Sequence, residues 1–123
     1  MTECVVITTS VAARDEAQRI AGALIGERLA ACVQVMPIES HYRWDGAIEQ
    51  ASELLLVIKT SAARAPAVQA RILALHSYDV PELLVTPVVG GAAAYLDWIA
   101  EQVEPAPDEG ERSFWACILL VLK

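Results

Sequence analysis

The most informative part of the chain for the fold is residues 32–60, CVQVMPIESHYRWDGAIEQASELLLVIKT. Two β-rich runs flank Asp45-Gly46, which is a strong hairpin signal because a type I′ turn needs positive φ at both central residues. We expect strands over 32–43 and 47–60. Pro37 predicts a bulge or a sheet edge, since proline donates no hydrogen bond to a ladder. Residues 54–58 do not alternate between apolar and polar, which predicts cover on both faces of that strand.

The segments around this hairpin alternate between strand and helix. Residues 4–9 form an apolar, β-rich run, and we expect a fourth strand over 82–89. Apolar spacing predicts helices over 13–28, over 66–76 and over 95–103. The order β-α-β-β-α-β predicts an α+β fold of the ferredoxin-like, split βαβ type, with a four-stranded antiparallel sheet and helices on one face. In the first helix the apolar stripe is Ala17, Ile20, Ala21, Leu24 and Ile25, and the charged residues expected off it are Arg14, Asp15, Glu16, Arg19 and Glu27.

The composition excludes several classes of protein. A chain of 123 residues is one domain in length, and 55% hydrophobic residues with 20% charged residues exclude intrinsic disorder. The net charge of −7, with scattered basic residues, argues against a nucleic-acid or anionic membrane partner. Three widely spaced cysteines form no disulfide framework, and neither a signal peptide nor a membrane span is recognisable. These features predict a cytoplasmic protein with reduced thiols.

The length of the hairpin predicts an oligomer. At about 3.3 Å per residue its arms reach roughly 40 Å, whereas a compact chain of this size has a radius of gyration near 14 Å. We therefore expect residues 41–50 to overhang their own domain. A neighbouring subunit would cover Tyr42, Trp44 and Ile48, which stand near the tip. The alternative is a hairpin that curls back onto its own core.

Four stretches together resemble one family in order and spacing. They are RLAACV (28–33), YRWDG (42–46) with the downstream Ile48-Glu49 and Lys59-Thr60, HSYDVPEL (76–83) and YLDWI (95–99). The chain is similar to the CutA divalent-cation tolerance family over about residues 4–103. The resemblance implies a ferredoxin-like domain over residues 1–104, with residues 105–123 as an extension that carries an apolar run, 114–122. It also implies a cytoplasmic homotrimer, similar in architecture to the PII signalling proteins, that is linked to tolerance of copper and other divalent cations.

The resemblance places metal ligands at the ends of the first strand and of the second helix, where this chain has Thr9 and Leu75-His76. A copper site needs imidazole or thiolate ligands that converge on one point. The candidate set is therefore His76, with Asp79 and Glu82 as oxygen donors. The alternative is that His76 sits at the end of a helix, where the helix dipole favours a cation.

The resemblance also implies an intersubunit cleft that could hold a small ligand or a partner protein. Its candidate residues here are Tyr42, Trp44, Lys59, Tyr78 and Trp98. The alternative is structural: the tryptophans are apolar anchors, and Lys59 with Glu82 is an ion pair or a pair of solvated charges.

No catalytic motif is present: the sequence has no GxSxG, Walker loop or GxGxxG. We therefore expect no enzymatic activity and no obligatory cofactor. The leading hypothesis is a homotrimeric divalent-cation tolerance protein that responds to metal ions such as Cu(II). The alternatives are a PII-like regulatory trimer with a ligand in the cleft, and a structural trimer without a ligand.

Overall fold

The computed structural model describes residues 3–104 and forms a four-stranded sheet with three α-helices. The extension expected over residues 105–123, with its apolar run, lies outside the described residues. In chain order the elements are β1 (Cys4–Val11), α1 (Arg14–Gly26), β2 (Cys32–Trp44), β3 (Ala47–Ser61), the short 3-10 helix η1 (Ala62–Arg64), α2 (Ala65–Leu75), β4 (Leu84–Pro87) and α3 (Ala93–Val103).

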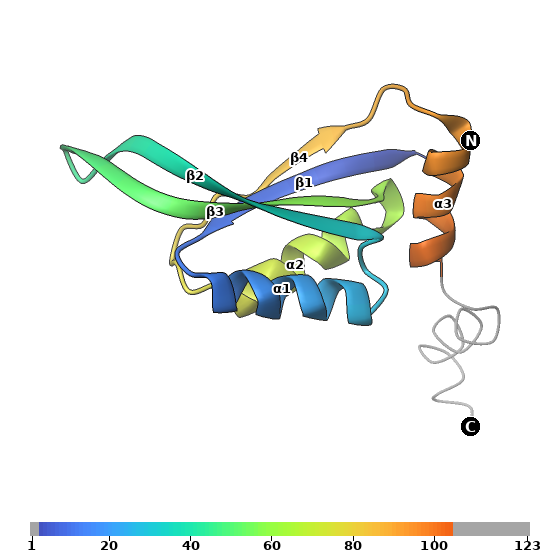
Figure 1. The fold of residues 1–123 in the computed structure, drawn as a ribbon, viewed down its shortest axis with the longest axis horizontal. Helices are drawn as coiled ribbons and strands as arrows, with labels where there is room; N and C mark the ends of the chain where they lie inside the picture. Colours follow the sequence, from blue (N-terminus) through green and yellow to red (C-terminus); the bar gives the residue numbers. More distant parts are fainter. Residues whose placement is uncertain (1–2, 105–123) are drawn as a thin grey trace.

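The sheet confirms the ferredoxin-like prediction. Its strand order is β2-β3-β1-β4, and every neighbouring pair is antiparallel. Figure 1 shows α1 and α2 side by side on one face of the sheet. α3 stands at the end opposite the hairpin tip (Figure 1). Within residues 3–104, no helix has the length and apolar composition needed to cross a bilayer.

The long hairpin is regular from its base to its tip. β2 and β3 pair without interruption from Cys32↔Lys59 to Trp44↔Ala47. Asp45 and Gly46 close it with φ values of 54° and 81°, as a type I′ turn requires. Pro37 makes no bulge and is tolerated because β2 is an edge strand. Every residue from 41 to 50 is exposed, so the distal hairpin projects beyond the domain (Figure 1).

The core lies between the sheet and the two helices. Ile7, Leu56 and Ile58 point from the central strands towards Ile20 of α1 and Ile72 of α2, and all five side chains are fully buried. Burial of each contributes about 1.5–3 kcal/mol. Leu56 and Ile58 are two residues apart on β3 and therefore point to the same face of the sheet, so the main core lies on that face.

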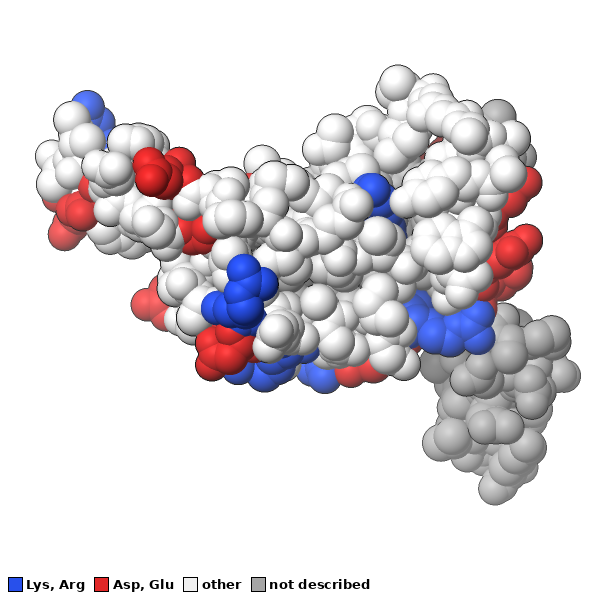
Figure 2. Space-filling view, in the orientation of Figure 1, with Lys and Arg blue, Asp and Glu red and all other residues white. Residues whose placement is uncertain are grey.

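The opposite face is less covered than the apolar run 54–58 led us to expect. Leu55 and Val57 lie between the buried Leu56 and Ile58 but are only partly buried, so residues 3–104 of one chain do not cover this face of β3. On the same face Met36 is 45% exposed and Leu84 is 60% exposed. We call this side of the sheet the open face. Figure 2 shows charged side chains on the hairpin and along the helices, with a broad uncharged area between them.

Element boundaries also differ from expectation, most clearly in α1 and β4. α1 ends at Gly26 rather than at residue 28, because Arg28 adopts a left-handed φ of 59° and turns the chain towards β2. β4 spans only Leu84–Pro87, because it pairs with no more of β1 than Val5–Thr8. The helical spacing over 13–28 and the strand-like run over 82–89 continue past the observed ends. Contacts between elements therefore determine where α1 and β4 end.

α3 packs across the end of the open face. Leu96 and Ile99 form a small buried cluster with Cys4, whose thiol donates to the Leu96 carbonyl oxygen at 3.8 Å. Burial, and secondarily the Asp97 carboxylate, raise the pKa of that thiol. Arg28 Nε and Nη2 donate to the carbonyl oxygens of Gln102 and Glu101, and Arg64 Nε donates to that of Val103. Two guanidinium groups therefore cap the last turn of α3, where a positive charge is favoured.

Candidate functional site

The main candidate site is a hollow at the base of the hairpin, with a volume of about 670 Å³. It lies between the sheet and the loop that joins α2 to β4. We call it the acidic hollow, and its lining residues are Ser10, Ser40, His41, Tyr42, Trp44, Glu53, Tyr78, Asp79, Val80 and Glu82.

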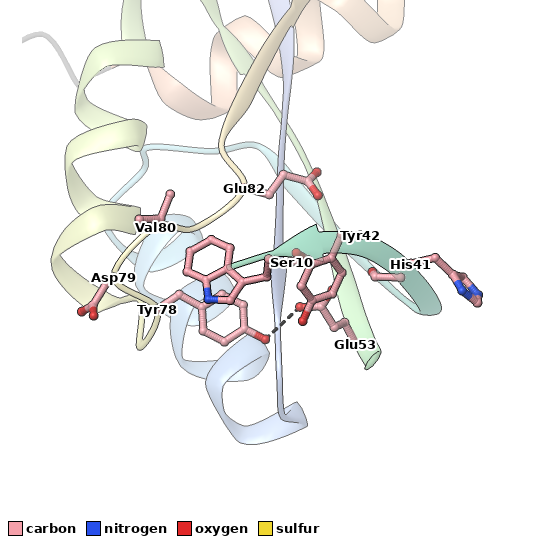
Figure 3. A pocket seen from close by; sticks show the side chains of 10 residues that line it. Ser10, His41, Tyr42, Glu53, Tyr78, Asp79, Val80 and Glu82 are labelled. Atoms are coloured by element: carbon pink, nitrogen blue, oxygen red, sulfur yellow. Dashed lines mark hydrogen bonds between the residues drawn. The ribbon is translucent and has the colours of Figure 1, made fainter. Parts of the chain in front are cut away.

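Strand alternation explains which side chains reach the hollow. Because side chains on a strand alternate between faces, Ser40, Tyr42 and Trp44 of β2 share the open face. The register places Ser10 opposite Leu55, and Glu53 opposite Ile38, on that same face. The loop 77–82 then supplies the opposing wall (Figure 3). The hollow therefore combines two strands of the hairpin, the end of β1 and one loop.

A hydrogen bond between Tyr78 and Glu53 joins the two walls. The Tyr78 hydroxyl donates to Glu53 Oε2 at 2.8 Å (Figure 3). Burial raises the pKa of the Tyr78 phenol to about 12, and the hydrogen bond to Glu53 and the nearby Glu16 and Tyr42 act in the same direction. Tyr78 is therefore neutral at physiological pH and stays a hydrogen-bond donor.

A buried carboxylate holds the loop behind Tyr78. Glu16 of α1 is only 6% exposed, although its sequence position suggested a solvated charge. Its Oε2 accepts the Ser77 backbone N–H at 2.8 Å, and its Oε1 accepts the Ser77 hydroxyl at 3.0 Å. Glu16 lies four residues before Ile20 and eight before Leu24, so it extends the buried stripe by one turn.

The side chain of His76 is fully buried, and its partners define its tautomer. Nε2 lies 2.8 Å from the Ser10 carbonyl oxygen, so Nε2 carries the proton. Nδ1 accepts the Tyr78 backbone N–H at 3.1 Å. Hydrogen bonds thus orient the ring from both sides, and Glu16 Oε2 lies 3.6 Å from Nδ1.

The structure does not bring the three candidate metal ligands together. His76 faces Ser10, Tyr78 and Glu16, whereas Asp79 and Glu82 are exposed and line the acidic hollow. Among residues 3–104, no three His, Cys, Asp or Glu side chains are grouped closely enough to hold a metal ion. Thr9, at the other expected ligand position, is buried, and its Oγ1 makes no hydrogen bond to a described residue.

The five candidate cleft residues fall into two groups in a single chain. Tyr42, Trp44 and Tyr78 line the acidic hollow. Lys59 lies at the other end of the open face, with its Nζ 5.8 Å from the centre of the Tyr95 ring, and Tyr95 stacks on Trp98 at 5.6 Å. One chain therefore separates an acidic, aromatic group from a basic, aromatic group.

Sequence reasoning missed Glu53 and Glu16 as functional positions. Glu53 has a local signal, because the hairpin register places it on the same face as Tyr42. Glu16 has a weaker one, its place four residues from Ile20 on the buried stripe. The bonds that define both roles come from Tyr78 and Ser77, which the chain brings in from another loop.

Comparisons with known proteins agree with the fold. The family model for the CutA1 divalent ion tolerance protein matches residues 4–102. The divalent-cation tolerance protein CutA of Thermus thermophilus is 45% identical over 102 residues, which are 82% of this chain and 97% of that protein. The chloroplastic protein CutA 1 of Oryza sativa is 41% identical over 96 residues, which are 77% of this chain and 54% of the rice protein.

Solved structures lead to the same conclusion. The periplasmic divalent cation tolerance protein CutA from Archaeoglobus fulgidus superposes with a TM-score of 0.80 and 38% identity, covering 82% of this chain and 99% of that one. These names describe tolerance of divalent cations rather than a reaction. With the family model matching most of its length, the chain belongs to the CutA1 divalent ion tolerance family.

Proposed function

We propose that this chain is a homotrimeric divalent-cation tolerance protein of the cytoplasm, without enzymatic activity, that takes part in the response to metal ions such as Cu(II). The observation that carries the proposal is the uncovered, apolar open face beside an overhanging hairpin. The names of the Thermus and Archaeoglobus relatives support the link to divalent cations.

The open face supports an assembly of several copies. Leu55, Val57, Met36 and Leu84 place apolar surface on a sheet face that no element within residues 3–104 covers along its length. In the described part of the chain, β2 and β4 also leave two unpaired edges, and such edges invite pairing with another strand. A cyclic trimer satisfies both demands, because each copy offers one edge and receives the other.

Light scattering and a copper titration test the proposal together. We expect a mass three times the 13.3 kDa of one chain at micromolar concentration. Calorimetric titration with Cu(II) is then compared between the wild type, His76→Ala and the control His41→Ala, whose histidine is exposed on the hairpin. A well-folded monomer would refute the assembly, and unchanged heats in His76→Ala would remove His76 as a ligand.

The second candidate is a PII-like regulatory trimer that binds a small ligand, and the acidic hollow favours it. In this candidate Lys59 and Trp98 of one subunit complete the hollow formed by Tyr42, Trp44 and Tyr78 of another. The charges of the two groups are opposite, as such a contact needs. A thermal-shift screen with small metabolites tests it, and a screen without any shift would count against it.

A further inference from the structure

The charge of the acidic hollow is of one sign. Glu53, Asp79 and Glu82 line it, and among residues 3–104 no lysine or arginine does so. A site for phosphate or carboxylate ligands normally offers Arg, Lys or a row of backbone N–H groups. The hollow of a single chain therefore suits a positively charged ligand.

The walls of the hollow are aromatic. Tyr42, Trp44 and Tyr78 supply three rings to its lining. Aromatic faces attract ammonium and guanidinium groups through the ring quadrupole, and rings that surround a quaternary ammonium group bind it most effectively. A bare divalent metal ion needs several oxygen ligands within about 2.0–2.6 Å instead, and the described residues offer no such group.

The ring of Tyr78 is held in place for this role. Its hydroxyl donates to Glu53 Oε2, and its backbone N–H donates to His76 Nδ1, so the residue is fixed at both ends. The bond uses one carboxylate oxygen of Glu53 and leaves Oε1 for a ligand. Figure 3 shows Tyr42 and Tyr78 near this carboxylate, whereas Asp79 and His41 point away.

We propose that the acidic hollow binds an organic cation, an amine or quaternary ammonium group, with Tyr42, Trp44 and Tyr78 as the aromatic walls and Glu53 as the charge partner. The inference takes from the second candidate function a hollow walled by Tyr42, Trp44 and Tyr78 that binds a small ligand, and it names the chemical class of that ligand. It departs from that candidate in one respect, because it leaves Lys59 of the neighbouring copy outside the hollow. Glu53 stabilises the positive charge of the ligand, and the three rings replace the weakly held water around that charge.

The test uses tetramethylammonium as the probe and tert-butanol as its neutral analogue of similar shape. Both are titrated into the full-length protein, and binding is followed by tryptophan fluorescence and by ligand NMR line broadening. We expect saturable binding of tetramethylammonium and no saturable binding of tert-butanol. Glu53→Gln should weaken it about tenfold, as expected for loss of a charge partner near 1.4 kcal/mol. Glu27→Gln, an exposed acid on the helix side, is the matched control and should leave binding unchanged.

Other outcomes overturn the inference. Equal binding of the neutral analogue would show a merely apolar hollow. Binding of inorganic phosphate but not of the ammonium probe would leave a ligand-binding trimer and refute the cation class. If Lys59→Met creates ammonium binding that the wild type lacks, the lysine of a second copy fills the hollow, and the inference fails. Light scattering on the same samples reports the trimer separately, and Glu82→Gln checks the charge requirement should Glu53→Gln not fold.

Discussion

Glu16 should contribute more to stability than the most evident ion pair on the surface. Within residues 3–104 it is buried without a Lys or Arg partner, with His76 Nδ1 3.6 Å from its Oε2, and it accepts two hydrogen bonds from Ser77. A hydrogen bond to a charged group contributes about 1.5–3 kcal/mol. Glu16→Gln keeps one acceptor oxygen but turns an amide N–H₂ towards the other donor. We therefore expect a loss of about 1.5–3 kcal/mol, and more in Glu16→Ala.

The matched control is Glu27→Gln. The Glu27–Arg71 pair is short, at 2.8 Å, but both side chains are more than a third exposed. Exposed pairs contribute about 0–1 kcal/mol, because water screens them. For a chain of 123 residues, 1 kcal/mol corresponds to about 4 °C in Tm. Glu16→Gln should thus lower Tm by about 6–12 °C and Glu27→Gln by less than about 4 °C.

The assay is thermal and urea unfolding at one fixed protein concentration, because stability of an oligomer depends on concentration. Ser77→Ala should remove only the hydroxyl bond and cost less than Glu16→Gln, because the backbone N–H bond remains. Equal losses in Glu16→Gln and Glu27→Gln would refute the reasoning, since burial would then make no difference to the carboxylate.

Four further substitutions test other parts of the structure. Gly46→Ala should cost about 1–2 kcal/mol because φ is +81° there, whereas Gly22→Ala in α1 should gain about 0.4–1 kcal/mol; urea unfolding of both variants checks the contrast. Tyr78→Phe should remove from an ultraviolet pH titration the phenol whose pKa is raised to about 12. The neutral Tyr78 stabilises the fold fully below pH 10.0, and this contribution is lost as pH rises through about 12. If the titration curve of Tyr78→Phe is the same as that of the wild type, the late ionisation does not come from Tyr78. Arg64→Ala should loosen the last turn of α3, since its bond to the Val103 carbonyl oxygen is lost, and faster amide exchange confined to that turn is the expected readout.

The sequence predicted features that local chemistry determines. Asp45-Gly46 specifies its turn by itself, and the regular register that follows from it fixes which side of the hairpin carries Tyr42 and Trp44. The hairpin overhang followed from its length alone. These predictions needed no knowledge of which distant segments meet.

The parts that sequence reasoning missed depend on contacts between distant segments. Glu16 looks like a solvated helix charge until Ser77, 61 residues later, brings two donors to it. Likewise, the sequence does not show that the carbonyl oxygen of Ser10, 66 residues earlier, accepts a hydrogen bond from His76 Nε2. Neither a helical period nor a strand alternation carries this information, because it depends on how the loop after α2 folds back over α1 and β1.

His76 links the metal hypothesis to the acidic hollow. A metal ion needs a nitrogen lone pair, and Nε2 carries the proton that Ser10 accepts. The remaining lone pair, on Nδ1, accepts the backbone N–H of Tyr78. Coordination at Nδ1 therefore breaks that bond and releases the residue whose ring walls the hollow. Because coupling between two sites is reciprocal, a ligand that needs the Tyr78 wall must weaken metal binding at His76 by the same factor. A copper titration with and without tetramethylammonium measures this coupling, and equal copper affinities would show that metal binding does not use His76 Nδ1.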